Sequence, residues 1–118
     1  MNPTLRRFRE LCLSLPETGE VFVDNWGHPT FRVGGQKMFA SCSPYDSDQP
    51  SFGLKVEKAH QQALVNSDPR YTVSPYVGKH GWITIQGSGV LEWDELRELI
   101  EESYILNAPK RLAKLVAG

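Results

Sequence analysis

The stretch FRVGGQKMFASC, from Phe31 to Cys42, decides the fold of this chain. Two short runs of mostly apolar residues, 31–33 and 38–42, stand on either side of Gly34 and Gly35. Paired glycines accept the positive φ angles of a tight hairpin turn, so the stretch predicts two antiparallel strands joined by a hairpin. Short apolar runs continue on both sides of it, at 21–23, 52–56, 71–73 and 82–86. The middle of the chain therefore predicts an antiparallel sheet.

Helical spacing surrounds this sheet. Apolar residues recur every three or four positions in four segments, at 5–15, 57–65, 96–106 and 112–116. In the second segment we expect Ala59, Ala63 and Leu64 on the apolar side. Strands and helices do not alternate as they do in a parallel α/β fold. The sequence therefore predicts an α+β fold in which N- and C-terminal helices pack on one face of an antiparallel sheet, and its 118 residues suffice for a single domain, 1–118.

Side chains on a strand alternate between the two faces of a sheet. The inward face is expected to form one core, made of Phe31, Val33, Phe52, Leu54, Ile83, Ile85, Leu96 and Ile100. The opposite face then carries Arg32, Lys55, Trp82 and Thr84. Two cations, a large aromatic ring and a hydroxyl can hold a phosphate backbone while stacking on bases. The alternative is that both cations are ordinary solvated residues and that a helix or loop partly covers Trp82.

A second candidate site is the loop from Tyr76 to Gly81. Gly78 and Gly81 allow the backbone to approach a ligand closely, as in loops that bind anions. Lys79 and His80 supply charge, and Tyr76 supplies an aromatic ring. The spacing does not match a P-loop, which needs a longer interval between its glycines and a Gly-Lys-Ser/Thr ending. We therefore expect no nucleoside triphosphatase. Simple hairpin geometry is the alternative explanation of the two glycines.

No residue cluster of the sequence indicates catalysis or metal binding. His28, His60 and His80 lie in separate segments without a carboxylate or cysteine at ligand spacing. Cys12 and Cys42 match no metal or redox motif, so they are expected to be buried free thiols. No nucleophile motif is present either. The chain is therefore expected to be a binding protein rather than an enzyme, without a metal or cofactor.

The charge of the chain is unevenly distributed although its formal total is only −1. Residues 26–89 carry six Lys/Arg against four Asp/Glu, whereas residues 90–118 carry four against six, which predicts a polarised surface. No stretch is apolar for the roughly 20 residues that a membrane-spanning helix requires. The N-terminus also lacks the separate apolar segment of a secretory signal. We therefore expect a cytoplasmic protein that does not interact with membranes.

Several segments together resemble the MmcQ/YjbR family. They occur in the expected order over nearly the whole chain, at 26–33, 35–40, 54–56, 78–82, 101–104 and 109–111. The resemblance implies a small bacterial α+β domain with an antiparallel sheet, similar in layout to secretion-chaperone-like folds. It also implies DNA binding through a winged arrangement of β-hairpins, without agreed catalytic residues. The wing-like parts would be the hairpin at 34–37 and the loop around Lys79.

The sequence thus predicts a small binding module that contacts DNA or another nucleic acid weakly. The residues expected to make this contact are Arg32, Lys37, Lys55, Lys79 and Trp82. Weak binding is expected because a strong nucleic-acid binder usually has a conspicuous basic patch, and this chain is nearly neutral. The alternative is a protein-binding adaptor or chaperone-like module, which holds a peptide or a second copy of itself on the same sheet face or on an apolar helix surface.

Overall fold

A computed structural model describes residues 3–23, 28–34, 37–43, 50–87 and 92–117. Its helices are α1 (Pro3–Leu13), α2 (Lys58–Ser67), α3 (Trp93–Asn107) and α4 (Lys110–Ala117), with one short 3-10 turn, η1 (Gly78–His80). Its strands are β1 (Thr18–Val23), β2 (His28–Val33), β3 (Lys37–Ser43), β4 (Ser51–Lys55), β5 (Tyr71–Val73) and β6 (Trp82–Gln86). None of the helices described is long and apolar enough to cross a membrane.

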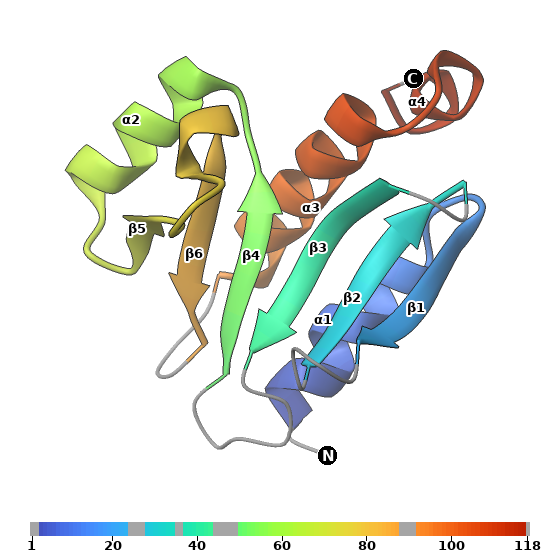
Figure 1. Cartoon of the computed structure of the whole chain (residues 1–118), viewed down its shortest axis with the longest axis horizontal. Helices are drawn as coiled ribbons and strands as arrows, with labels where there is room; N and C mark the ends of the chain where they lie inside the picture. Colours follow the sequence, from blue (N-terminus) through green and yellow to red (C-terminus); the bar gives the residue numbers. More distant parts are fainter. Residues whose placement is uncertain (1–2, 24–27, 35–36, 44–49, 88–91, 118) are drawn as a thin grey trace.

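The six strands form one sheet in the order β1-β2-β3-β4-β6-β5, and all neighbouring pairs are antiparallel. Helices α1 and α3 lie behind the sheet in the view of Figure 1, while α2 lies beside β5 and β6, and α4 follows α3. The predicted α+β fold, with N- and C-terminal helices on one face of an antiparallel sheet, is confirmed. We call the face turned away from α1 and α3 the open face, because no helix in the described ranges covers it.

The core lies between the sheet and the two helices behind it. The eight residues that the sequence predicts for a single core all belong to one buried cluster, which confirms the prediction. Phe8 of α1 is fully buried in this cluster. Its ring stacks on Phe52 at 4.1 Å between centroids and meets Phe31 edge-to-face at 5.9 Å. Aromatic contacts therefore fix α1 against β2 and β4.

A β-bulge in β3 determines which of its residues reach the open face. Phe31 pairs with Ala40 whereas the next residue, Arg32, pairs with Met38, so Phe39 is one extra residue in β3. Phe39 and Ala40 are both buried, and the Phe39 ring meets Tyr104 of α3 edge-to-face at 5.5 Å. The bulge thus turns two consecutive side chains toward the helices and keeps Met38 on the open face with Arg32.

The predicted apolar side of α2 is wrong at two of its three positions. Ala59 and Ala63 are exposed, and only Leu64 is partly buried. The residue that α2 buries is Gln61, whose Nε2 donates to the carbonyl oxygens of Gly78 (2.8 Å) and Trp82 (2.9 Å). The orientation of α2 is therefore set by a buried hydrogen bond donor that satisfies two backbone carbonyls, and periodicity of apolar residues does not reveal this.

The two cysteines are buried free thiols, as predicted. Burial raises the pKa of Cys42 to about 12, and burial together with the nearby charges of Cys42 and Glu20 raises the pKa of Cys12. Thiols in the unfolded chain have pKa values of about 8.5. Because folding favours the protonated thiols, their contribution to stability is fully present below a pH of about 8.5 and is lost as the pH rises toward 12.

We expect the free energy of unfolding to fall by about 1 to 2 kcal/mol per buried thiol between pH 8 and pH 10, since a thiol titrating only in the unfolded state contributes up to about 1.4 kcal/mol per pH unit. Urea denaturation at several pH values measures this slope. The Cys42→Ala variant should lose about half of it. Equal stability of the parent protein at pH 8 and pH 10 would contradict the prediction.

Candidate functional site

A groove of about 470 Å³ lies on the open face, between the strands and the segment 74–77. It is lined by Met38, Ser41, Ser51, Phe52, Gly53, Ser74, Pro75, Tyr76, Val77, Trp82 and Thr84. The lining combines apolar and aromatic side chains with four Ser/Thr hydroxyls, and among the described residues it includes no carboxylate. The volume and the lining of this groove are typical of sites that bind a small molecule.

Gly53 of β4 forms the floor of the groove. It pairs with Ser41 on one side and with Thr84 on the other. A Cβ atom at this position would lie 2.6 Å from Ser41 Oγ and 4.0 Å from Trp82 Cε3. The absence of a side chain here therefore lets Trp82 and Ser41 approach each other across β4 and leaves the middle of the open face hollow.

The loop between β5 and β6 forms one wall of the groove and is anchored at both ends. The Ser74 N–H donates to the carbonyl of Trp82 (3.1 Å), and the hydroxyls of Ser74 and Thr84 are 2.9 Å apart. At the other end, Gly81 has a φ of +97°, and a Cβ atom there would lie 2.2 Å from the Val56 carbonyl oxygen. Only glycine fits this position, so the loop is held close to the backbone at the end of β4.

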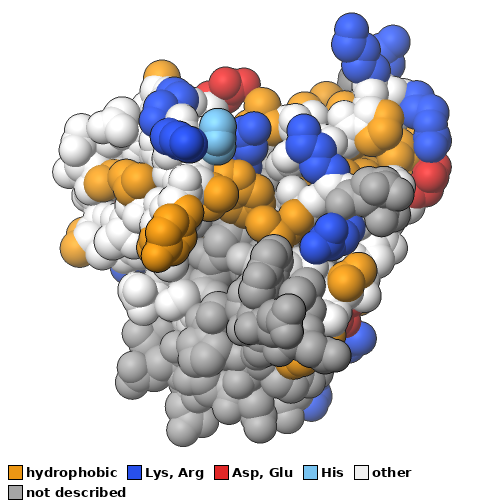
Figure 2. Space-filling view, in the orientation of Figure 1, with side chains coloured by type: hydrophobic (Ala, Val, Ile, Leu, Met, Phe, Trp, Pro, Cys, Tyr) orange, Lys and Arg blue, Asp and Glu red, His pale blue; other side chains and the backbone are white. Residues whose placement is uncertain are grey.

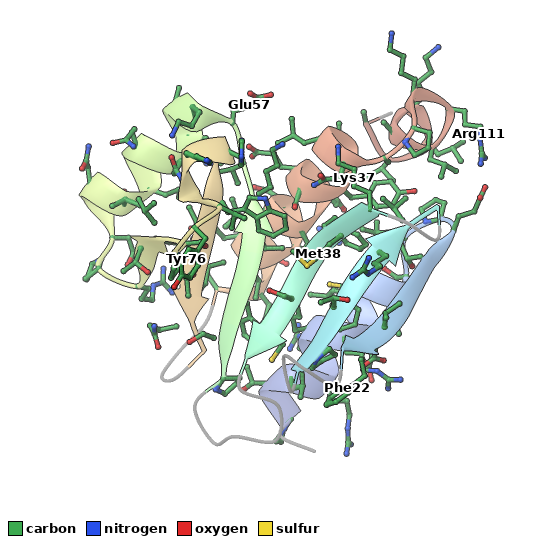
Figure 3. The ribbon with its side chains drawn as sticks, in the orientation of Figure 1. Phe22, Lys37, Met38, Glu57, Tyr76 and Arg111 are labelled. Carbon is green, nitrogen blue, oxygen red and sulfur yellow. The ribbon has the colours of Figure 1, made fainter. Side chains whose placement is uncertain are left out.

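Tyr76 stands at the tip of this wall. Its φ is +65°, and the Val77 N–H donates to the Pro75 carbonyl at 2.7 Å, which closes a three-residue turn around it. Turns of this type with a positive φ are rare and strained for residues other than glycine. The Tyr76 side chain is 96% exposed. Figure 3 shows Tyr76 and Met38 on opposite sides of β4 on the open face.

Two of the predicted cations lie on the open face with Trp82. Lys55 pairs directly with Trp82, and Arg32 pairs with Met38, whose side chain lines the groove. The Nε of Arg32 donates to the Thr30 hydroxyl at 3.3 Å, which orients its guanidinium. Trp82 is only 8% exposed, so its ring forms part of the groove surface rather than projecting from it.

Further cations lie near the end of the groove where β6 begins. Lys79 is exposed on η1, three residues before Trp82. Lys58, at the start of α2, places its Nζ 3.5 Å from the Gly78 carbonyl on the same turn. Figure 2 shows Lys and Arg side chains gathered along the upper part of this face, above a group of hydrophobic side chains. We call Arg32, Lys55, Lys58 and Lys79 the basic group.

Lys37 occupies a different position from the other predicted cations. It pairs with Val33, whose side chain is in the core, so the register places Lys37 on the helix side of the sheet. Figure 3 shows Lys37 at the start of β3, where it is exposed. Part of the predicted wing around it, at 35–36, lies outside the described residues, as do Trp26 and Gly27 of the preceding connection.

Reasoning from the sequence missed Lys58, Met38 and Ser74 as site residues, whereas it named Tyr76 as the aromatic ring of the candidate loop. Alternation along β3 would have found Met38 only if the bulge at Phe39 were known. Within the part of the chain that the structure describes, no group of three or more His, Cys, Asp or Glu side chains is arranged to hold a metal ion. The groove and the basic group together offer stacking surface and positive charge, which suit an aromatic, anionic ligand.

Comparisons with known proteins agree with this fold. A crystal structure of a Deinococcus radiodurans protein with the domain DUF419 superimposes with a TM-score of 0.79 at 23% identity, over 96% of this chain and 87% of that one. A crystal structure of a Pseudomonas syringae protein gives 0.70 at 21% identity, over 90% of this chain and 98% of that one. None of the curated proteins compared with the chain matches it. The YjbR family model matches residues 13–106, and the chain belongs to the YjbR family.

Proposed function

We propose that this protein is a non-catalytic binding module that contacts nucleic acid weakly through the open face, in the cytoplasm. Phosphates are held by the basic group, and the groove beside it offers aromatic and apolar surface to the bases. Most hydrogen bonds between proteins and nucleic acids go to phosphate and sugar, and these contacts carry no sequence information directly. The proposed binding is therefore tolerant of sequence.

The observation that carries this proposal is the register of the central strands. It brings Arg32, Lys55 and Trp82 to one face although they are far apart in the sequence. The described lining of the groove beside them has no carboxylate that would repel a phosphate. Cations next to an aromatic surface are the common arrangement of proteins that bind single-stranded nucleic acid without sequence preference.

Binding should be weak because few charges are available. The formal net charge of the chain is −1, and the basic group contains four cations. A protein with so few phosphate contacts is expected to have a dissociation constant of roughly 10⁻⁴ to 10⁻⁶ M at physiological salt, which is typical of non-specific complexes.

A titration of a fluorescently labelled oligonucleotide at several salt concentrations tests the proposal. We expect the logarithm of the association constant to fall linearly with the logarithm of the salt concentration, with a slope of about −2 to −4, because three to four phosphates each contribute about −0.7 to −0.9. Fluorescence anisotropy between 20 and 200 mM salt measures this slope. An absence of binding at 20 mM salt would refute nucleic-acid binding.

A second candidate function is that of a protein-binding adaptor. The observation that favours it is a second groove, of about 350 Å³, between α3, α4 and Glu57. Its lining combines the apolar residues Ile105, Leu106 and Val116 with Glu98 and other glutamates. A lysine-rich amphipathic helix would match this surface. The adaptor would be favoured if such a peptide binds, if Glu98→Lys weakens this binding, and if substitutions on the open face leave it unchanged.

A further inference from the structure

We infer that the groove on the open face is a subsite for one unpaired base, so that the ligand class of this protein is single-stranded nucleic acid rather than duplex. The inference rests on the proposed function and makes it more specific. It adds a residue, Tyr76, and a discrimination between two forms of nucleic acid that phosphate contacts alone do not give.

The walls of the groove suit the flat faces of a base. Trp82 is almost covered, so only a small part of it borders the groove, and Gly53 beside it leaves the floor without a side chain. Met38 borders the groove on β3, and Tyr76 borders it from the loop before η1 (Figure 3). An aromatic ring and a polarisable thioether on opposite sides of β4 offer stacking surface to any base, since every base has a π-face.

The polar groups of the groove can adapt to different base edges. The hydroxyls of Ser74 and Thr84 are hydrogen-bonded to each other, and either of them can be the donor. Ser41 and Ser51 add two more hydroxyls to the lining. A hydroxyl both donates and accepts, so these groups can pair with the donor or the acceptor edges of a base. Such a lining favours an unpaired base without fixing its identity.

The basic group is placed to hold the phosphates that flank such a base. Lys55 lies directly beside Trp82 on the neighbouring strand, and Arg32 lies beyond Met38 at the other side of the groove. A strand whose base enters the groove would therefore have a cation near it on each side. Charge complementarity with a phosphate backbone distinguishes this occupant from a neutral aromatic molecule.

A duplex cannot use the groove in the same way. Its bases are stacked on one another and present only their edges, so their faces do not reach a recessed surface. Placing a paired base in the groove would require it to leave the stack, and this costs free energy that a single strand does not spend. A duplex can still contact the basic group through its phosphates. We therefore expect duplex binding to be weaker, though not absent.

Tyr76 is the residue on which this inference can be tested. Its side chain is 96% exposed, so its removal should not disturb the core. Its strained turn is closed by a short backbone hydrogen bond, which fixes the backbone of Tyr76 beside the groove. Residues kept in rare backbone conformations are concentrated at functional sites.

The experiment uses a single-stranded oligonucleotide that carries one 2-aminopurine, and a duplex of the same length and label. The parent protein should quench 2-aminopurine in the single strand and bind this strand at least about 10-fold more tightly than the duplex at equal salt. Tyr76→Ala should weaken single-strand binding by about 5- to 100-fold, the usual effect of losing one base–aromatic stack. It should leave duplex binding and the salt slopes unchanged.

Two control variants define the outcomes. Tyr76→Phe keeps the ring and should retain the single-strand affinity. Leu115→Ala removes another exposed apolar side chain, which lies outside the groove on α4, and should have no effect. Equal binding of single strand and duplex, with Tyr76→Ala indistinguishable from the parent, would overturn the base subsite while leaving phosphate binding intact. Loss of all salt-dependent binding would instead overturn the proposed function itself.

Discussion

Replacing Phe8 with alanine is expected to lower the free energy of unfolding by about 3 to 5 kcal/mol, the usual cost of a buried Phe→Ala change. Phe8 is fully buried, stacks on Phe52 at 4.1 Å and meets Phe31 edge-to-face at 5.9 Å. The substitution therefore leaves a cavity where α1 meets the sheet and removes two aromatic contacts. Since domains of this size have total stabilities of about 5 to 15 kcal/mol, the variant should be only marginally folded.

Chemical denaturation followed by circular dichroism measures this loss. The matched control is Phe22→Ala, which makes the same change at a side chain that is 48% exposed on the edge strand β1. It should cost less than about 1 kcal/mol, as expected for a partly exposed position outside the core. If the two variants lose similar amounts of stability, α1 does not pack on the sheet as described.

Much of the sheet could be predicted from the sequence because its strands follow simple alternation. The bounds of β5 and β6 match the runs at 71–73 and 82–86, and the face assignments of Arg32 and Lys55 follow from their buried neighbours. In these strands each core residue is followed by a residue that lies on the other face of the sheet. Because one face of the sheet is buried, this alternation indicates which face each side chain takes.

The parts that could not be predicted depend on contacts between distant segments. The bulge at Phe39 exists because Phe39 packs on Tyr104 of α3, and its carbonyl accepts a hydrogen bond from the Ser103 hydroxyl at 2.6 Å. Nothing in the sequence near Phe39 indicates an extra residue in the strand. The buried Gln61 is a similar case, because its two acceptors, in η1 and at the start of β6, are 17 and 21 residues away.

The candidate site shows the same division. Arg32, Lys55 and Trp82 share a face for reasons of local alternation, so sequence reasoning could bring them together. Tyr76 joins them only because Ser74 and Gly81 fasten its loop against Thr84 and Val56, respectively. A groove is a property of several segments at once, and its floor at Gly53 has no sequence pattern that distinguishes it from an ordinary strand glycine.

The second large effect is expected on nucleic-acid binding when Arg32, Lys55 and Lys79 are all replaced by glutamine. If each of them neutralises one phosphate, their loss should lower the magnitude of the log-affinity versus log-salt slope by about 2 to 3. At 0.1 M salt this corresponds to roughly 100-fold weaker binding, and the difference should shrink as the salt concentration rises. Stability should change little, because cations at partly exposed strand and loop positions contribute little to folding.

The salt dependence of binding for the parent, this triple variant and a charge-matched control tests the central claim most directly. The control replaces Arg97, Lys110 and Lys114, which are exposed on α3 and α4, so the net charge falls equally without touching the open face. We predict that the control keeps the slope of the parent and that the triple variant loses about 2 to 3 from its magnitude. Equal slopes for the parent and the triple variant, or an equal loss in the triple variant and the control, would contradict a nucleic-acid interface on the open face.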